Sequence, residues 1–223
     1  KVPIVAVTLL PALGYFEQQL DEWGNQKELP VAWDPSLYAR KLPATVEVAI
    51  EGRPVRIGAW QYDIGGVTAH TVPLLLLDTR EEGNSQADRE LTARLYGGDQ
   101  RYRLAQEIIL GIGGVRMLRA LGYAGIERYH MNEGHAALLV LELLRESGNR
   151  DSGQWDFNDV RRRCVFTTHT PVPAGHDQFP YDLVQRVLGE PLPGEVLRML
   201  GGAAQLNMTL LGLNMSGHLN GVA

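Results

Sequence analysis

The sequence predicts an α/β fold with a mostly parallel sheet, and three observations support this. Residues 3–10 form a continuous apolar run, which is typical of a strand covered on both faces. Residues 126–146 and 164–176 each begin as a short predicted strand, at 126–131 and in the apolar run 164–166, and continue into a polar loop. The first of these loops leads into a strongly apolar helix, as in alternating strand and helix units. Because open α/β sheets bind ligands beyond the carboxyl ends of their strands, we expect the chemistry in these two loops.

Composition excludes several classes of protein. The 223 residues carry a net charge of −5, which provides no basic surface for nucleic acid. Cys164 is the single cysteine, so an intrachain disulfide and a cysteine metal site are excluded. No apolar stretch reaches the roughly 20 residues of a membrane helix, and Lys1 is not followed by a signal peptide. We expect a cytoplasmic protein without membrane partners. Both ends look like cuts through a larger protein.

The next segments predict one helix and a set of antiparallel strands. Residues 15–23 have apolar side chains at helical spacing, at Phe16, Leu20 and Trp23. Residues 42–78 then alternate between apolar and polar, with a turn at 51–54 and a further strand at 68–78. We interpret 42–78 as an antiparallel β-meander inserted into the mostly parallel domain, followed by a charged, exposed loop at 78–86.

From residue 88 the pattern is mainly helical. Apolar residues between Leu104 and Leu121 trace one helical face that ends at Gly122. The segment Gly111-Ile-Gly-Gly114 lies within this pattern and lacks the spacing of a dinucleotide-binding loop, so it predicts close helix packing. Further helices are predicted at 156–163, 180–188 and 206–215, and a surface turn at 148–153. The three arginines at 161–163 are interpreted as a solvated face.

The loop Asn132-Glu-Gly-His135 presents an amide, a carboxylate and an imidazole within four residues. A metal site would use His130, Glu133 and His135, but this spacing differs from that of the helical two-histidine zinc motif. We therefore predict no metal site. Binding of a polar ligand, or a network that ties the loop to the following helix, fits these residues better.

The loop 167–176 follows the apolar strand at 164–166. It holds His169 between threonine hydroxyls, and Pro171 and Pro173 stiffen it. A titratable imidazole on a stiff polar loop suits recognition of a polar ligand such as a sugar. The alternative is that His169 is a structural histidine that caps a neighbouring backbone group.

The two loops, taken together, resemble two segments of the α-glucan (glycogen/maltodextrin) phosphorylases, in the same order and at a similar separation. The resemblance spans nearly the whole chain and is strongest to the bacterial branch. Further matching segments are Gly14-Tyr-Phe, Leu95-Tyr-Gly-Gly-Asp-Gln100, Gln106-Glu-Ile-Ile-Leu-Gly-Ile-Gly-Gly-Val-Arg116, Asn207-Met-Thr209 and Asn220-Gly-Val222.

This resemblance implies a fold, a reaction and a cofactor. The family uses inorganic phosphate and pyridoxal phosphate to release glucose 1-phosphate from α-1,4-glucans with retention of configuration. Its fold has two Rossmann-like halves (the GT-B arrangement), and residues 1–223 would be part of the N-terminal half. The lysine that holds pyridoxal phosphate belongs to the other half, so no cofactor-binding residue is expected here. The expected partners are the α-1,4-glucan, phosphate, the C-terminal half and a second copy in a homodimer.

The resemblance also implies roles for individual residues. His169 is the expected catalytic residue, since the matching histidine bonds the reacting glucose and its carbonyl faces the developing positive charge. The remaining expected substrate-binding residues are Asp99, Gln100, Asn132, Glu133, His135 and Thr170.

Three positions depart from the pattern of the family. Asp99 and Gln100 match a mobile loop that gates the site, although animal enzymes have asparagine at the second position. Glu133 matches an aspartate of the animal enzymes. Pro11-Ala-Leu13 replaces more polar residues before the Gly-Tyr-Phe motif, which alters a local contact and leaves the chemistry intact.

Two other functions remain open at this point. One is a carbohydrate-binding unit that has no chemistry of its own. The other is a glycoside hydrolase in which Glu133 and Asp99 act as the carboxylate pair. If the chain is part of a phosphorylase, it lacks the segments of the family that bind the cofactor and phosphate. We therefore predict that it has no phosphorylase activity alone.

Overall fold

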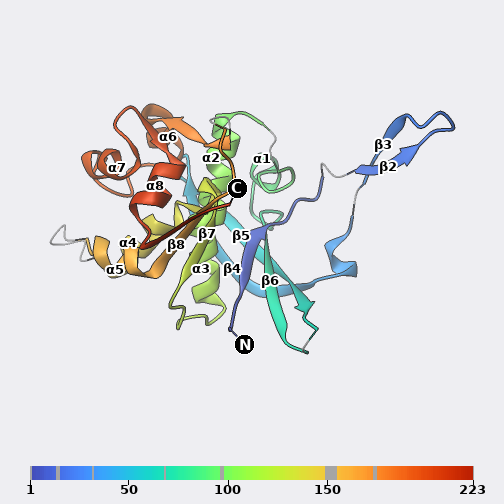
Figure 1. Ribbon diagram of the computed structural model, residues 1–223, viewed down its shortest axis with the longest axis horizontal. Helices are drawn as coiled ribbons and strands as arrows, with labels where there is room; N and C mark the ends of the chain where they lie inside the picture. Colours follow the sequence, from blue (N-terminus) through green and yellow to red (C-terminus); the bar gives the residue numbers. More distant parts are fainter. Residues whose placement is uncertain are drawn as a thin grey trace.

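The computed structural model describes residues 2–13, 16–31, 33–67, 69–95, 98–148, 155–172 and 175–222 (Figure 1). Eight α-helices are present in these ranges: α1 Gln86–Arg89, α2 Gln100–Ile108, α3 Gly114–Ala120, α4 Leu139–Ser147, α5 Phe157–Arg163, α6 Tyr181–Val187, α7 Gly194–Gly201 and α8 Met208–Asn214. The strands there are β1 Ala6–Leu9, β2 Phe16–Leu20, β3 Gln26–Pro30, β4 Arg40–Ile50, β5 Arg53–Gly65, β6 Thr71–Asp78, β7 Tyr129–Asn132, β8 Cys164–Thr168, β9 Gln178–Pro180, β10 Gln205–Asn207 and β11 His218–Gly221. Two 3-10 turns, η1 Pro35–Leu37 and η3 Gly134–Ala136, and a π-helical turn, η2 Ile109–Gly113, are also present in these ranges.

The larger sheet has the strand order β1-β6-β5-β4. β1 runs parallel to β6, and the pairs β6–β5 and β5–β4 are antiparallel. Glu51 and Gly52 both have positive φ, 52° and 74°, which is the geometry of a tight two-residue hairpin turn. The strands expected within 42–78 are therefore present in this sheet. The expected start of the third strand, Thr68, lies outside the described residues.

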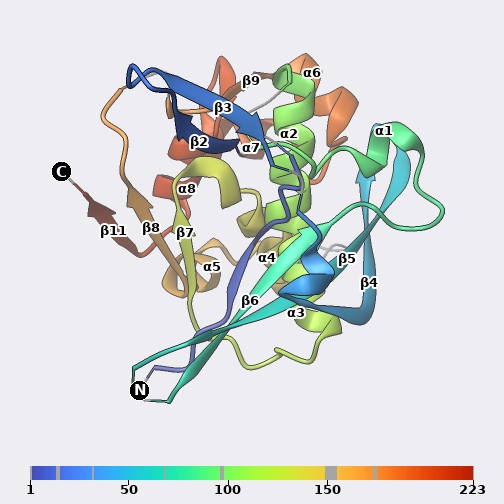
Figure 2. The same ribbon diagram turned by 90° about the vertical axis from the view of Figure 1, so that its right-hand side faces the viewer.

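The smaller sheet is parallel, in the order β11-β8-β7 (Figure 2). Its strands end at Asn132, Thr168 and Gly221, and parallel strands bring these ends to one edge. The predicted α/β class is confirmed, with both parallel and antiparallel pairing. Short antiparallel pairs, β9 with β10 and β2 with β3, complete the strand pairing among the described residues.

A long helix made of α2, the π-helical turn η2 and α3 connects the two sheets. Its glycines lie against neighbouring elements: a Cβ on Gly111 would lie 2.7 Å from the backbone nitrogen of Leu139, and one on Gly113 would lie 2.5 Å from Ile57 Cδ1. These separations are too short for a side chain, so the predicted close packing is confirmed. The helix ends at Gly122 (φ 86°), also as predicted.

The helix predicted for 15–23 is wrong in the part that the structure describes, 16–23. β2 and β3 form a hairpin that projects away from the rest of the molecule (Figure 1). The Asp21 carboxylate accepts hydrogen bonds from the backbone nitrogens of Trp23 and Asn25, which fixes the turn. Phe16 and Trp23 are 48% and 77% exposed. Without a surface to bury its apolar side chains, a helical face gains nothing.

The segment 78–86, predicted to be exposed, is partly buried. Asp78 is 2% exposed and accepts hydrogen bonds from Trp60 Nε1 (3.0 Å) and from the Arg80 side chain. Asn84 is also buried, where its side chain bonds the backbone of Arg56. The prediction failed because part of this segment bonds to β5, through Trp60 and the backbone of Arg56, which its own composition does not reveal.

The remaining predictions differ mainly at element ends. α5, α6 and α8 match the predicted helices within one or two residues, whereas α7 and β11 were not predicted. The predicted turn at 148–153 lies outside the described residues after Gly148. Of the three arginines at 161–163, Arg163 lies over the Tyr129 ring at 5.4 Å, so this face is only partly solvated. No described helix combines the length and the apolar character that a membrane crossing needs.

Candidate functional site

The two predicted loops meet at the carboxyl edge of the smaller sheet. Asn132 pairs with Thr167 across β7 and β8, and the Glu133 backbone nitrogen donates to the Thr167 carbonyl at 2.9 Å. β7 and β8 therefore end next to each other. The 132–135 loop and residues 168–170 therefore lie side by side, as expected for neighbouring parallel strands.

Glu133 connects these loops directly. Its side chain is buried, and Oε1 accepts hydrogen bonds from the Thr168 hydroxyl (3.3 Å) and from the backbone nitrogens of His169 and Thr170, the latter at 3.0 Å. Its backbone has φ 65°, a conformation that residues with a Cβ rarely adopt. Its other oxygen, Oε2, is buried and has no hydrogen-bond partner among the described residues. Glu133 thus holds the second loop against the first.

His169 and Thr170 stand at the rim of this junction. The His169 side chain is exposed, and Thr170 is half-buried. Pro171 follows and is exposed, while Pro173 lies outside the described residues. The exposed ring of His169 is accessible to a ligand at the end of β8.

His130 is not part of a metal site with Glu133 and His135. Its Nε2 lies 2.7 Å from the Thr167 hydroxyl, which connects β7 to β8. Among the described residues, the group with ligand atoms close enough for a metal contains Glu107, His135 and Asp177 instead. The alternative metal site of His130, Glu133 and His135 is therefore not formed.

Asp99 and Gln100 begin α2 and line a polar pocket of about 500 Å³. Asp99 Oδ1 accepts a hydrogen bond from the Tyr102 backbone nitrogen (2.9 Å), and thus caps the helix. Gln100 Nε2 donates to the Gln178 carbonyl at 3.3 Å. The residues that line the pocket are Gly98, Asp99, Gln100, Arg103, His176, Asp177, Gln178, Phe179 and Gln205.

A charged cluster connects the polar pocket to the 132–135 loop. Arg103 Nη2 lies 2.5 Å from Asp177 Oδ2, 3.3 Å from His135 Nδ1 and 3.7 Å from Glu107 Oε1. The guanidinium therefore occupies the centre of the three groups that could hold a metal. It already provides the positive charge that these groups require.

The acidic groups of this cluster have shifted pKa values. Burial, and then the nearby charge of Asp177, raise the pKa of Glu107 well above its usual value. Burial would also raise the pKa of Asp177. Hydrogen bonds from His135, Glu107 and Arg103 outweigh this effect and hold the pKa of Asp177 well below its usual range. The pKa values of these two neighbouring carboxyl groups are thus shifted in opposite directions.

Sequence reasoning missed Arg103, Glu107 and Asp177. One signal was available: Glu107 lies on the apolar face of α2, beside Leu104 and Ile108, where an acidic residue needs a partner. The partner Asp177 lies 70 residues further along the chain, so no spacing rule connects the two.

The structure places the predicted residues in two connected groups. Asn132, Glu133, His169 and Thr170 form the loop junction, while Asp99 and Gln100 lie at the polar pocket. His135 joins them through Arg103. Amide, hydroxyl, carboxylate and imidazole groups predominate throughout, which suits a ligand with many hydroxyl groups.

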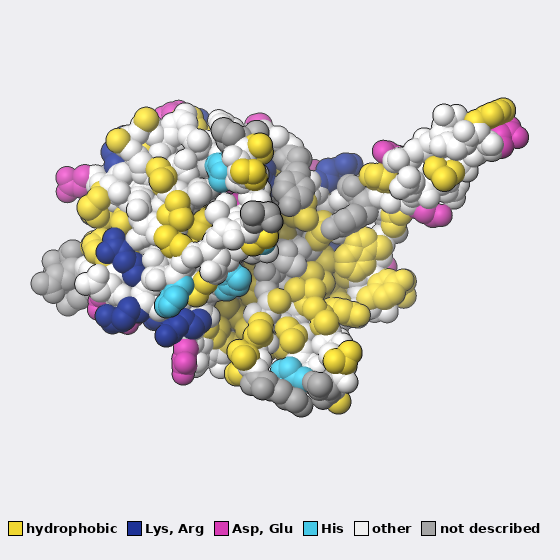
Figure 3. Space-filling view, viewed as in Figure 1, with side chains coloured by type: hydrophobic (Ala, Val, Ile, Leu, Met, Phe, Trp, Pro, Cys, Tyr) yellow, Lys and Arg dark blue, Asp and Glu magenta, His cyan; other side chains and the backbone are white. Residues whose placement is uncertain are grey.

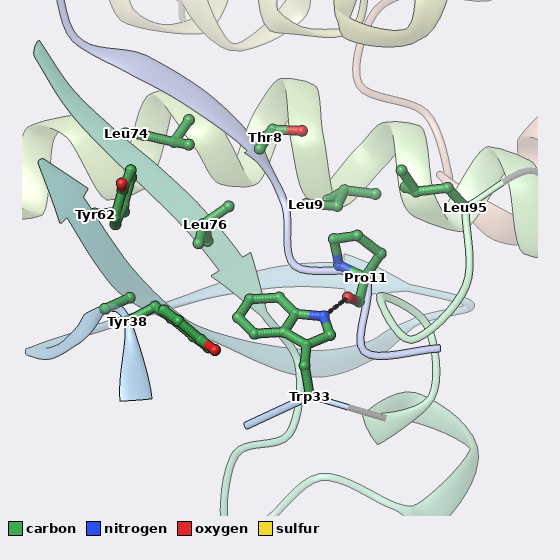
Figure 4. A pocket seen from close by; sticks show the side chains of 10 residues that line it. Thr8, Leu9, Pro11, Trp33, Tyr38, Tyr62, Leu74, Leu76 and Leu95 are labelled. Carbon is green, nitrogen blue, oxygen red and sulfur yellow. Dashed lines mark hydrogen bonds between the residues drawn. The ribbon is translucent and has the colours of Figure 1, made fainter. Parts of the chain in front are cut away.

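A second pocket, of about 390 Å³, is apolar and lies on the open face of the larger sheet (Figure 4). Trp33 closes one side and donates from Nε1 to the Pro11 carbonyl at 2.9 Å. Tyr38, Tyr62 and Leu76 provide further walls. Hydrophobic side chains gather over this region of the surface (Figure 3). The apolar pocket contains none of the predicted site residues.

Comparisons with known proteins point to one family of enzymes. The chain is 40% identical over 254 aligned residues to the glycogen phosphorylase of Mycobacterium tuberculosis, and 38% identical over 237 to the maltodextrin phosphorylase of Thermococcus litoralis. Both alignments cover all of this chain. The glycogen phosphorylase of Aquifex aeolicus is 32% identical over 197 residues, which cover 82% of the chain. The chain spans 27–28% of the length of these relatives. No family model matches the chain.

Proposed function

Because the chain belongs to the α-glucan phosphorylase family, we propose that it provides part of the glucose-binding and glucan-binding wall of a phosphorylase. The complete enzyme would release glucose 1-phosphate from α-1,4-glucans with inorganic phosphate. Since the chain spans 28% of the length of its glycogen phosphorylase relatives, this activity belongs to the whole protein. The same proposal includes the GT-B arrangement, in which residues 1–223 are part of the N-terminal half and 42–78 an insertion, and a cytoplasmic homodimer.

The junction of the two loops carries this proposal. Glu133 holds the backbone that follows β8, and the His169 side chain is exposed at this edge of the sheet, where β7 ends at Asn132. In the proposed enzyme His169 bonds the reacting glucose, and its carbonyl dipole faces the positive charge that develops at the anomeric carbon. Thr170 and Asn132 contribute neutral hydrogen-bonding groups at the same place.

The polar pocket provides a second region for the glucan. Asp99 and Gln100 line it together with Arg103 and Asp177. A sugar chain presents hydroxyl groups that both donate and accept hydrogen bonds, and these four side chains match that requirement. In the proposed enzyme Asp99 and Gln100 bind glucose, while the loop that carries Glu133 and His135 lines the approach of the glucan.

The residues of this chain do not fit pyridoxal phosphate. Its described lysines are Lys27 on β3 and Lys41 on β4, and neither lies on a site loop. Lys41 is paired with Glu81 at 2.9 Å. In the complete enzyme the cofactor would provide a phosphate group as acid/base partner, held by a lysine outside this chain. The chain alone is expected to show neither cofactor absorbance nor phosphorylase activity.

An assay of products tests the proposal. A polypeptide of the relatives' length that carries this chain, given maltodextrin and phosphate, should release glucose 1-phosphate. His169→Ala should lower its turnover by about 100-fold or more, because positioned groups contribute on that scale. Free glucose released without phosphate would identify a glycoside hydrolase instead. That alternative has little support, since Glu133 and Asp99 are both engaged with backbone nitrogens rather than held as a pair.

A carbohydrate-binding unit without chemistry is the alternative for this chain alone. The side chains that line the polar pocket all belong to this chain, which favours some affinity for glucan. Calorimetry with maltoheptaose measures this affinity directly. Weaker binding by the Gln100→Ala chain would place the sugar in the pocket, and unchanged binding would exclude it there.

A further inference from the structure

We propose that Glu133 is a positioning residue that sets the direction of the His169 carbonyl. The inference rests on the proposed function, because it concerns the backbone dipole assigned there to the developing charge. The evidence is the set of contacts that Glu133 makes with three successive residues, Thr168 to Thr170.

The peptide that follows His169 is held by its nitrogen. Thr170 donates its N–H to Glu133 Oε1 at 3.0 Å, and this peptide is trans. In a planar trans peptide the N–H and the C=O point in opposite directions. The His169 carbonyl must therefore point away from Glu133. The direction of this dipole is fixed by a side chain on the neighbouring strand end.

The preceding peptide is fixed in the same way. His169 donates its own backbone N–H to the same oxygen of Glu133. Two consecutive N–H groups that converge on one acceptor define both peptide planes and leave the backbone between them little freedom. The His169 Cα, and with it the start of the side chain, is fixed as well.

The negative charge of Glu133 adds a second effect. A peptide N–H that donates to a carboxylate becomes more polarised, and the carbonyl of the same peptide then becomes a stronger acceptor. The His169 carbonyl would thus carry more negative charge than a free one. Such a dipole stabilises a positive charge that forms in front of it.

The local structure is unusual for an anchor that serves packing alone. Glu133 is 7% exposed, and its backbone is in the left-handed region at φ 65°. A buried carboxylate and a rare backbone conformation both oppose folding. Every hydrogen bond found for this carboxyl among the described residues goes to 168–170. The arrangement thus lowers the stability of the fold while it fixes the orientation of one loop.

The first arm of the test uses the 223-residue chain and needs no activity. Amide hydrogen exchange is measured by NMR at His169 and Thr170 for the chain, for Glu133→Gln and for the control Glu127→Gln. Glu127 is exposed and precedes β7, so its substitution removes the same charge outside the loop. Glu133→Gln should exchange roughly tenfold faster at both amides, and Glu127→Gln at the rate of the chain. Equal rates in all three proteins refute the anchor.

The second arm measures kcat and KM in a polypeptide of the relatives' length. Glu133→Gln should lower kcat by roughly 10-fold to 100-fold and change KM by less than about threefold, because the carbonyl acts on the transition state. Glu133→Asp, which keeps the charge, should fall between the wild type and Glu133→Gln. A rise in KM with constant kcat, or an aspartate variant no better than the glutamine variant, overturns the inference. A wild-type protein without phosphorolysis refutes the proposed function and the catalytic part of this inference together, while the exchange arm still decides the anchor.

Discussion

Replacing Arg103 by methionine tests how the polar pocket is held to the 132–135 loop. Methionine keeps most of the aliphatic length of the side chain and removes the guanidinium. The carboxyl groups of Asp177 and Glu107 and the imidazole of His135 would then face each other without a cation between them. We expect a large loss of stability, because these groups are removed from water to different degrees.

The magnitude follows from the burial of each partner. The side chain of Arg103 is 18% exposed, that of Glu107 2% and that of Asp177 25%. Removing one partner of a buried ion pair costs about 3–5 kcal/mol, and water at Asp177 offsets part of this, which leaves about 2–4 kcal/mol. For a chain of this size, the melting temperature should fall by roughly 4–16 °C. Arg186→Met is the control. Its pair with Asp182 is mostly exposed, so its loss should cost under about 0.5 kcal/mol.

The loss should also depend on pH. The pKa of Asp177 is lowered in the folded chain, so its stabilisation is present above its unfolded value of about 3.9 and disappears as pH falls below it. Without Arg103, less of this stabilisation exists. The difference in the free energy of unfolding between the wild type and Arg103→Met should be largest above about pH 5 and should narrow below about pH 4. Urea unfolding above about pH 5 and below about pH 4 measures this difference. Equal shifts for Arg103→Met and Arg186→Met, or a gap independent of pH, would refute the reasoning.

Three further predictions concern buried positions. Glu107→Gln should gain stability over the wild type as pH rises above about 4.3. The reason is that burial raises the pKa of Glu107 in the folded state only, and urea unfolding at pH 4 and pH 8 tests this. Gly212→Ala should cost about 1–3 kcal/mol, since the new Cβ would lie 2.5 Å from the Phe166 ring; Gly221→Ala, with open space around it, is the thermal-unfolding control. Burial raises the pKa of the Cys164 thiol to about 12, so alkylation by iodoacetamide should be slow in the native chain and fast in urea.

The sequence predicted the elements whose side chains are sorted by burial. The helical face from Leu104 to Leu121 and the alternation around Val48 and Val55 each reflect a surface packed against a neighbour. The hairpin of β2 and β3 could not be recognised in this way. Its apolar residues stay exposed, so their spacing carries no information about a buried face.

The site was predictable to the extent that it depends on single loops. The sequence identified both loops at the ends of predicted strands, and at β8 a change from apolar to polar residues marks the end of the strand. It could not identify that Glu133 turns inward to bind backbone nitrogens, nor that Arg103 sits between Asp177 and His135. These contacts join residues 32 to 74 positions apart, and sequence spacing is silent on which distant groups meet.

The glycines of the π-helical turn determine the distance between the larger sheet and α4, and thereby the position of the 132–135 loop that precedes α4. Gly111 touches the start of α4, and Gly113 touches the larger sheet at Ile57. At these two positions the backbone of the turn lies directly against the start of α4 on one side and the Ile57 side chain on the other. The turn therefore keeps a short and constant distance between these two neighbours. Residues that contact no ligand therefore determine how far the loop stands from the sheet, and a methyl group on either side would widen that gap.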